Sequence, residues 1–189
     1  SCLLKNIFEH FGYSEVKYFD EIYGKKTKYI IPDFEYLIDN QDRIKGLFLT
    51  HGHYENMGAT DELLQQLPNI KVYATKFTKF ILTNDGVDEK RITEITPHKK
   101  INFGPVSIFP ISVNHSAPDS VMYVVNTKDG AIVYTGDFII DPKMMDKYSM
   151  DLGKIAYISA SKSYTALIDF DLSDETIEIS LKTLKKCLT

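Results

Sequence analysis

Two histidines separated by one glycine are the first residues of this chain whose type and spacing could perform chemistry. His51, Gly52 and His53 directly follow the apolar run GLFLT. Glu55 adds a carboxylate two residues later. Imidazole nitrogens and carboxylate oxygens are ligands of zinc, and catalytic zinc sites keep one position for water. Taken alone, the pair also fits two ordinary polar loop residues, so a metal site needs further ligands from elsewhere in the chain.

Two later segments offer ligands of the same kind. His115 comes just after an apolar run that ends at Val113, and Asp137 stands beside a glycine in the run YTGD. Functional side chains of α/β folds are often carried by loops just past the strand ends, so these two are expected at one edge of a sheet. His10 and His98 lack such a setting, and we interpret both as structural or surface residues.

Alternating apolar runs and turn residues predict the elements that would position these ligands. Strands are expected at Val16–Phe19, Lys28–Ile31, Gly46–Thr50, Ile70–Ala74, Arg91–Ile95, Ile101–Phe103, Val106–Val113, Ser120–Asn126 and Ala131–Tyr134. Helical spacing is found at Phe34–Ile38, Met57–Leu67, Lys76–Leu82 and Thr176–Leu188. Ile155–Ser159 is a further short apolar run, and Lys128-Asp129-Gly130 is typical of a hairpin turn. This order predicts an α/β layered architecture with a largely mixed sheet.

Composition and charge restrict the classes of function. The 189 residues are 43% hydrophobic and 25% charged, which suits one globular domain with a good core. The net charge of −4 argues against a protein that binds nucleic acid mainly by electrostatic attraction, so any RNA contact must be local or carried by a partner. Cys2 and Cys187 fit two free thiols in a reducing cytoplasm. No apolar run approaches the roughly 18 residues of a membrane span.

The segments around the candidate ligands resemble one family of nucleases. GLFLTHGHYENMGAT is similar to the HxHxDH loop of metallo-β-lactamase-fold hydrolases. IPDFEYLIDNQDRIKGLFLTHGH looks like the ribonuclease J family, of the β-CASP group, and so do VNHSAPDSV and GAIVYTGDFIID. The resemblance runs from about Asp20 to about Ser163. It implies a metallo-β-lactamase-like αββα layered sandwich, of which the chain carries the N-terminal half only.

The resemblance also implies a role for each candidate residue by its position. The implied metal ligands are His51, His53, Glu55, His115 and Asp137. The catalytic groups among them are the carboxylates of Glu55 and Asp137, and Asp137 matches an aspartate that bridges two metals. Ser116 matches a contact to a substrate phosphate, whereas Asp20 and Asn56 match supporting positions.

The chain departs from the family pattern at three positions. Glu55 replaces an aspartate, which keeps the charge but adds one methylene, and Asn56 replaces a histidine. A neutral amide oxygen is a poor ligand for zinc. Ala160 stands where the family has an acid. These changes predict a depleted second-metal pocket, and therefore at most one ion, zinc or manganese.

The resemblance implies a domain organisation as well. Residues 1–172 are expected to form a partial metallo-β-lactamase domain, and residues 173–189 a helix that leads toward a missing β-CASP domain. The chain therefore looks like the front half of a longer protein.

Three functions remain open at this point. The first is a weak or inactive ribonuclease J paralogue that supports an active ribonuclease. The second is an active metal-dependent exo- or endoribonuclease when full length, and the third is a small-molecule metallo-hydrolase of the same fold. The implied partners are RNA and a sister ribonuclease J subunit, in a homo- or hetero-oligomer when full length. The implied location is the cytoplasm, without membrane contact.

Overall fold

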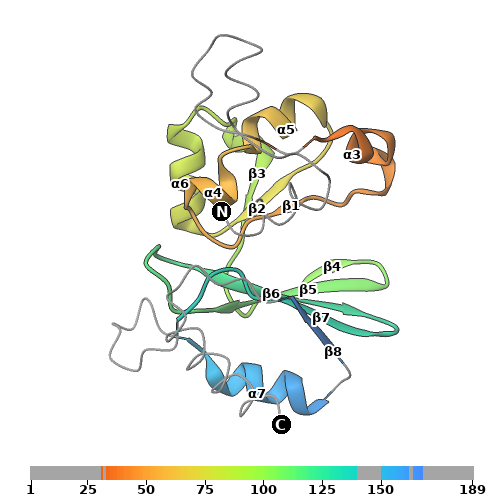
Figure 1. Cartoon of the computed structure of the whole chain (residues 1–189), viewed down its shortest axis with the longest axis vertical. Coiled ribbons are helices and arrows are strands. Elements are labelled where there is room, and N and C mark those ends of the chain that lie inside the picture. The colour runs from red at the N-terminus through yellow and green to blue at the C-terminus, as the bar shows by residue number, and fades with distance from the viewer. Residues whose placement is uncertain (1–30, 32, 140–149, 162–163, 168–189) are drawn as a thin grey trace, which may run out of the picture.

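The computed structural model describes residues 31, 33–139, 150–161 and 164–167. In this part of the chain the strands form two sheets that stack face to face, and helices cover the outer side of each sheet (Figure 1). The layers follow the order helix, sheet, sheet, helix. This confirms the α/β layered sandwich expected from the sequence.

The first sheet has three parallel strands. Their order is β1 (Leu47–Phe48), β2 (Val72–Ala74) and β3 (Ile92–Glu94). Parallel neighbours need a crossover connection, which is usually helical. The crossovers contain α4 (Tyr54–Met57), α5 (Thr60–Gln66) and α6 (Lys76–Asn84). The strands predicted at Gly46–Thr50, Ile70–Ala74 and Arg91–Ile95 are therefore confirmed in a shortened form.

The helices around this sheet are short. α3 (Glu35–Asp39) confirms the helical turn predicted there, and the 3-10 turn η1 (Gln41–Arg43) follows it. The helix expected over Met57–Leu67 is two helices instead, because α4 ends at Met57 and α5 begins at Thr60. Gly58 lies in the break, and glycine is among the poorest helix formers.

The second sheet has five strands in chain order. They are β4 (Ile101–Phe103), β5 (Val106–Ser112), β6 (Val121–Thr127), β7 (Gly130–Tyr134) and β8 (Tyr164–Leu167). All neighbours are antiparallel except β7 and β8, so the sheet is mixed, as expected. The predicted turn at Lys128-Asp129-Gly130 joins β6 to β7, and Thr127 Oγ1 donates to Gly130 O at 3.0 Å within it.

Three groups of buried apolar residues fill the spaces between the four layers. The group under α5 and α6 includes Leu63, Val72 and Leu82. The group between the sheets consists of Ile95, Ile108, Val121 and Tyr123, with partly buried side chains around them. The group between the second sheet and α7 (Leu152–Ser161) consists of Ile111, Val113, Met122, Val124, Ala131, Phe138 and Ile155. Strand β6 therefore buries both of its faces, with alternate side chains directed to different cores.

Aromatic rings join the two sheets. Phe48 of β1 stacks on Tyr73 of β2, with ring centroids 4.4 Å apart and an angle of 4° between the planes. Phe103 of β4 and Tyr123 of β6 meet Phe48 edge-on, at 5.8 and 5.6 Å. Edge-to-face and offset-stacked pairs add stabilisation beyond the apolar area that they bury. These contacts fix the end of β1 against the second sheet.

Helix α7 was not predicted from the sequence, which indicated only a short apolar run in this region. The short apolar run Ile155–Ser159 lies inside this ten-residue helix, and strand β8 after it was not foreseen. The elements expected at Val16–Phe19 and Thr176–Leu188, and nearly all of Lys28–Ile31, lie outside the described residues.

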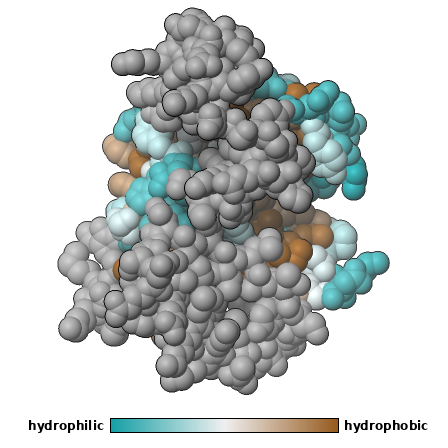
Figure 2. Space-filling view, in the orientation of Figure 1, coloured by the Kyte–Doolittle hydropathy of each residue, from teal (hydrophilic) through white to brown (hydrophobic). Residues whose placement is uncertain are grey.

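Figure 2 shows hydrophobic side chains at the junction of the two sheets and hydrophilic ones over the region of α3. Among the described residues, no helix is long and apolar enough to span a membrane.

Arg91 binds the chain just before β2, and replacing it tests how much this contact stabilises the first sheet. It ends the 3-10 turn η2 (Glu89–Arg91), and its guanidinium donates to Leu67 O at 2.9 Å and to Ile70 O at 2.8 Å. Replacing Arg91 by Met removes these charged donors, and we expect the free energy of unfolding to fall by about 2–3 kcal/mol. Urea denaturation measures the change. The neighbouring exposed substitution Lys90→Met is the control, with an expected change within about 0.5 kcal/mol; equal effects would contradict the assignment.

Candidate metal centre

The candidate ligands come from four positions at one edge of the two sheets. His51 and His53 follow β1 at its carboxyl end. His115 lies in the loop between β5 and β6, and Asp137 follows β7. Because β5, β6 and β7 are antiparallel in turn, the end of β5, the start of β6 and the end of β7 meet at the same edge. The fold therefore brings together residues that are up to 86 positions apart in the chain (137 minus 51).

The four side chains gather as the sequence predicted. One ligand atom from each of His51, His53, His115 and Asp137 lies within 4.8 Å of the others. His53 Nδ1 is 3.1 Å from His115 Nε2, and Asp137 Oδ2 is 3.4 Å from His51 Nε2 and 3.8 Å from His115 Nε2. Tetrahedral zinc with bonds of about 2.0–2.1 Å separates its ligand atoms by about 3.3–3.4 Å. The three separations lie on both sides of that value, so the residues present fit a metal ion.

His51 is the most enclosed member of the cluster. Its side chain is fully buried, and Thr50 Oγ1 lies 3.0 Å from its Nδ1. Burial is the largest cause of a lowered pKa at His51, and the nearby rings of His115 and His53 lower it further. Together they lower the pKa of His51 from 6.5 to about 3. The imidazole is therefore neutral at neutral pH, which is the form that binds a metal ion.

Asn56 stands against the ligand nitrogen of His51. Its amide Nδ2 donates to His51 Nε2 at 3.1 Å, so Nε2 is the acceptor nitrogen of the ring and Nδ1 carries the proton toward Thr50. The lone pair that Asn56 uses is the one that a metal ion would need. Sequence reasoning recognised Asn56 as a poor ligand but did not foresee this contact.

Glu55 and Ser116 lie on the open side of His53. Glu55 Oε1 is 3.7 Å from His53 Nδ1, and its carboxylate is not among the four clustered ligands. The Glu55 side chain is about one third exposed (37%), far more than that of Asp137 (7%). Ser116 is exposed, and its Oγ is 3.4 Å from His53 Nε2. Both groups can therefore reach a molecule that approaches the cluster from solvent.

Gly136 allows the Asp137 loop to approach the histidine loop. It has a φ of +56°, and a Cβ at this position would lie 2.8 Å from Cβ and Cγ2 of Thr50. Glycine adopts such a φ without penalty and leaves room for the approach. The glycine beside Asp137 is therefore a requirement of the site geometry.

The remaining sequence candidates are not part of the cluster that the described residues form. Asp20 and His10 are outside the described residues. Position 160 belongs to α7, whose side chains at that end are not described. His98 is separate from the cluster, stacks on Phe109 with ring centroids 6.2 Å apart, and has its Nε2 3.5 Å from Asp151 Oδ2. This agrees with its interpretation as a structural or surface residue.

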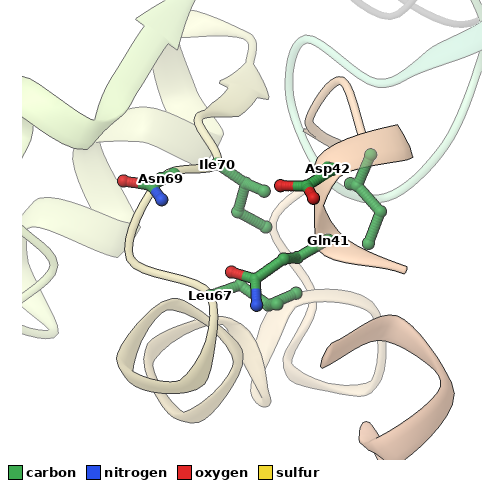
Figure 3. A pocket seen from close by; sticks show the side chains of 6 residues that line it. Gln41, Asp42, Leu67, Asn69 and Ile70 are labelled. Atoms are coloured by element: carbon green, nitrogen blue, oxygen red, sulfur yellow. The ribbon is translucent and has the colours of Figure 1, made fainter. Parts of the chain in front are cut away.

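A small polar pocket lies at the other end of the first sheet (Figure 3). It has a volume of about 190 Å³ and is lined by Gln41, Asp42, Ile44, Leu67, Asn69 and Ile70. These residues precede β1 and β2, whereas His51 follows β1. Because the strands are parallel, the pocket lies at their amino ends and the histidines at their carboxyl ends. The pocket is therefore not part of the metal centre.

Comparisons with known proteins agree with this geometry. Residues 24–152 match the family described as beta-lactamase superfamily domain. The chain belongs to this superfamily. Ribonuclease J 2 of Staphylococcus aureus is 34% identical over 155 residues, and the protein of the same name from Staphylococcus epidermidis is 33% identical over 156 residues. Each alignment covers 79% of this chain and 27% of the relative, so the chain spans about a quarter of the length of these relatives.

A solved structure supports the fold of the superfamily. Igni18, a metallo hydrolase from the archaeon Ignicoccus hospitalis, superposes with a TM-score of 0.54 at 14% sequence identity. The match covers 75% of this chain and 60% of Igni18. At this identity the likeness concerns the fold alone, whereas the resemblance to ribonuclease J expected from the sequence is confirmed by the staphylococcal relatives.

The lowered pKa of His51 predicts how stability depends on pH in protein kept free of metal by a chelator. Between pH 6.5 and about 3 the unfolded chain binds a proton at this position and the folded chain does not. His51 therefore makes the free energy of unfolding fall with decreasing pH, by up to about 1.4 kcal/mol per unit. Urea denaturation at several pH values should give a shallower slope for His51→Asn than for the parent. Parallel slopes would contradict the burial of a neutral His51.

Proposed function

We propose that this chain is part of a ribonuclease J-like protein of RNA processing and decay with an impaired metal site, a weak or inactive paralogue that supports an active ribonuclease. The observation that carries the proposal is the contrast within one site. Four candidate ligands lie together, whereas Asn56, at a position that the family fills with a histidine, donates its amide to His51 Nε2 and offers a second metal only a weak donor. A site of this kind retains metal affinity but loses part of what a two-metal nuclease needs.

The metal proposed for the cluster is one zinc ion, with manganese as the alternative. Three imidazole nitrogens and one carboxylate oxygen are typical zinc donors. A bound zinc ion would lower the pKa of a coordinated water molecule toward about 7. A second ion would have to share Asp137 and recruit Glu55 and Asn56, and the amide of Asn56 is a weak donor toward such a metal.

The chain's own residues would divide the remaining work between them. Asp137, nearly buried and close to two histidines, would hold the metal and balance its charge. Glu55, on the open side of His53, would orient a water molecule, although its extra methylene displaces the carboxylate from the place an aspartate would take. The hydroxyl of Ser116 would donate to a phosphate oxygen of the substrate. All three roles are those implied by the resemblance to ribonuclease J.

The second candidate function is an active metal-dependent ribonuclease when full length. The clustering of three histidines and one aspartate favours an active enzyme, because a single metal ion held by them could still activate water. The proposed impairment and this alternative differ in the number of ions bound and in the rate of RNA cleavage. Those two quantities decide between them.

The proposed partners follow from the same resemblance. They are RNA and a sister ribonuclease J subunit, in a homo- or hetero-oligomer when full length, in the cytoplasm and without membrane contact. The proposed organisation remains a partial metallo-β-lactamase domain over residues 1–172, with a helix at 173–189 that leads to a β-CASP domain. Because the net charge is −4, RNA binding would depend on local contacts and on the partner.

Metal content tests the first part of the proposal. We expect one zinc ion per chain after equilibration with zinc and gel filtration, measured by elemental analysis. His115→Ala removes one ligand and should lower zinc affinity by more than about 100-fold, beyond the loss typical of a residue that only supports a ligand. His98→Ala removes a histidine outside the cluster and should leave the affinity unchanged. Two ions per chain, or equal effects of the two substitutions, would contradict the proposed site.

Restoring the family residues tests the impairment. In the full-length protein, Glu55→Asp together with Asn56→His should introduce the missing ligand and raise cleavage of 5′-labelled single-stranded RNA by at least about 10-fold. Asn56→Ala is the matched control, because it removes the amide contact to His51 without adding a ligand. Rapid cleavage by the unmodified protein would exclude the inactive paralogue and favour the active ribonuclease.

A further inference from the structure

Two carbonyl groups just before His51 are held by the second sheet. The hydroxyl of Tyr123, on β6, donates to Leu49 O at 2.6 Å. Two residues earlier on the same strand, the backbone N–H of Val121 donates to Thr50 O at 2.9 Å. Leu49 and Thr50 are the residues that lead from β1 into the histidine loop. The start of that loop is therefore bonded to a strand of the other sheet.

The position of β1 explains why these bonds matter. In the described part of the first sheet, β1 is an edge strand, since it pairs with β2 only. Its last bond to β2 in this region joins Leu49 N to Tyr73 O at 3.0 Å. The carbonyl oxygens of Leu49 and Thr50 instead take their donors from β6. Beyond Leu49, the path of the chain depends on the second sheet.

The side chain of Tyr123 is held in a fixed position, and its hydroxyl remains a hydrogen-bond donor. Its side chain is almost completely buried, and its ring meets the ring of Phe48 edge-on at 5.6 Å. Burial raises the pKa of its hydroxyl far above the usual value near 10, so the group stays protonated throughout the physiological range. A packed ring fixes where the hydroxyl points, and a neutral hydroxyl always has a proton to donate.

Leu49, which accepts the hydrogen bond from Tyr123, is two residues before the candidate metal ligand His51. Thr50 follows Leu49, and Thr50 Oγ1 is 3.0 Å from His51 Nδ1. Thr50 also packs against the backbone of Gly136, next to Asp137. A displacement of Leu49 would therefore pass through Thr50 to the ring of His51. Metal ligands have to be placed within about 0.2 Å of their ideal distances, so a small displacement lowers affinity.

We propose that Tyr123 is a positioning residue of the metal centre, which sets the place of His51 by holding Leu49 O from the opposite sheet. The inference rests on the proposed metal-binding function. Tyr123 is 72 positions from His51 in the sequence (123 minus 51) and is not itself one of the candidate metal ligands. The inference nevertheless gives it a role in metal binding. Groups that hydrogen-bond a metal ligand directly typically contribute about 10- to 100-fold to metal affinity, and Tyr123 acts one step further away, through Leu49 and Thr50.

The substitution Tyr123→Phe isolates the hydroxyl. Phenylalanine keeps the buried ring and its packing on Phe48, and it removes only the donor to Leu49 O. We expect zinc affinity, measured by competition with a chromophoric chelator, to fall by up to about 10-fold, the lower end of the loss for a group bonded to a ligand itself. The visible spectrum of the cobalt-substituted protein, which reports the geometry of the ligands, should change as well.

Val124→Ala is the matched control. Val124 is the next residue on β6, and it is buried in the core that faces α7, on the opposite side of the strand from Tyr123. This substitution removes core volume without changing any bond to β1. It should lower thermal stability but leave zinc affinity and the cobalt spectrum unchanged. If Val124→Ala weakens zinc binding as much as Tyr123→Phe, the effect is one of general stability and the positioning role is overturned.

The remaining outcomes separate this inference from the proposed function. If the parent protein binds zinc and Tyr123→Phe binds it equally well with the same cobalt spectrum, Tyr123 has no positioning role. If the parent protein binds no zinc, the proposed metal function fails. The role of Tyr123 in positioning His51 is then tested in the metal-free protein, from the ¹H–¹⁵N spectra of the histidine rings. A shift of the His51 ring signals in Tyr123→Phe but not in Val124→Ala supports the role of Tyr123, and unchanged His51 signals overturn it.

Discussion

The structure of this site depends on the close approach of three imidazole rings to one carboxylate. The ring centroids of His51, His53 and His115 lie only 4.5–4.8 Å apart. Burial together with the neighbouring rings lowers the pKa of His51 and keeps its imidazole neutral. The second sheet supplies His115 and Asp137, and the first supplies the other two histidines. The stacking of the two sheets is therefore a condition for the site to exist.

Much of this arrangement could be predicted from local patterns in the sequence. Apolar runs and turn residues located every described strand except β8, and His51, His53, His115 and Asp137 were identified because each follows such a run. Strand β8 was missed, because its four residues give a weak signal and its parallel pairing with β7 is a long-range contact. The role of α7 was missed because a short apolar run does not distinguish a buried strand from a helix.

The contacts that adjust the site could not be predicted, because they join residues far apart in the chain. Nothing in the residue types links Tyr123 to Leu49, 74 positions away, and the hydrogen bond exists only because β6 crosses the end of β1. Gly136 is a similar case, since the lack of room for a side chain there arises from Thr50, in the loop after β1. The contact of Asn56 with His51 is nearer in sequence, but it depends on how α4 turns the amide back toward the ring. Sequence patterns thus identified the candidate ligands, whereas the groups that surround and orient them could be found only from the fold.

The ligand shell of a bound metal tests this account most directly. Zinc X-ray absorption spectroscopy on the protein loaded with one equivalent of zinc distinguishes imidazole nitrogen from other donors by its multiple scattering. We predict three imidazole ligands and oxygen ligands at about 2.0–2.1 Å. A first shell with one imidazole or none would mean that the histidines do not act together, and it would contradict the central claim.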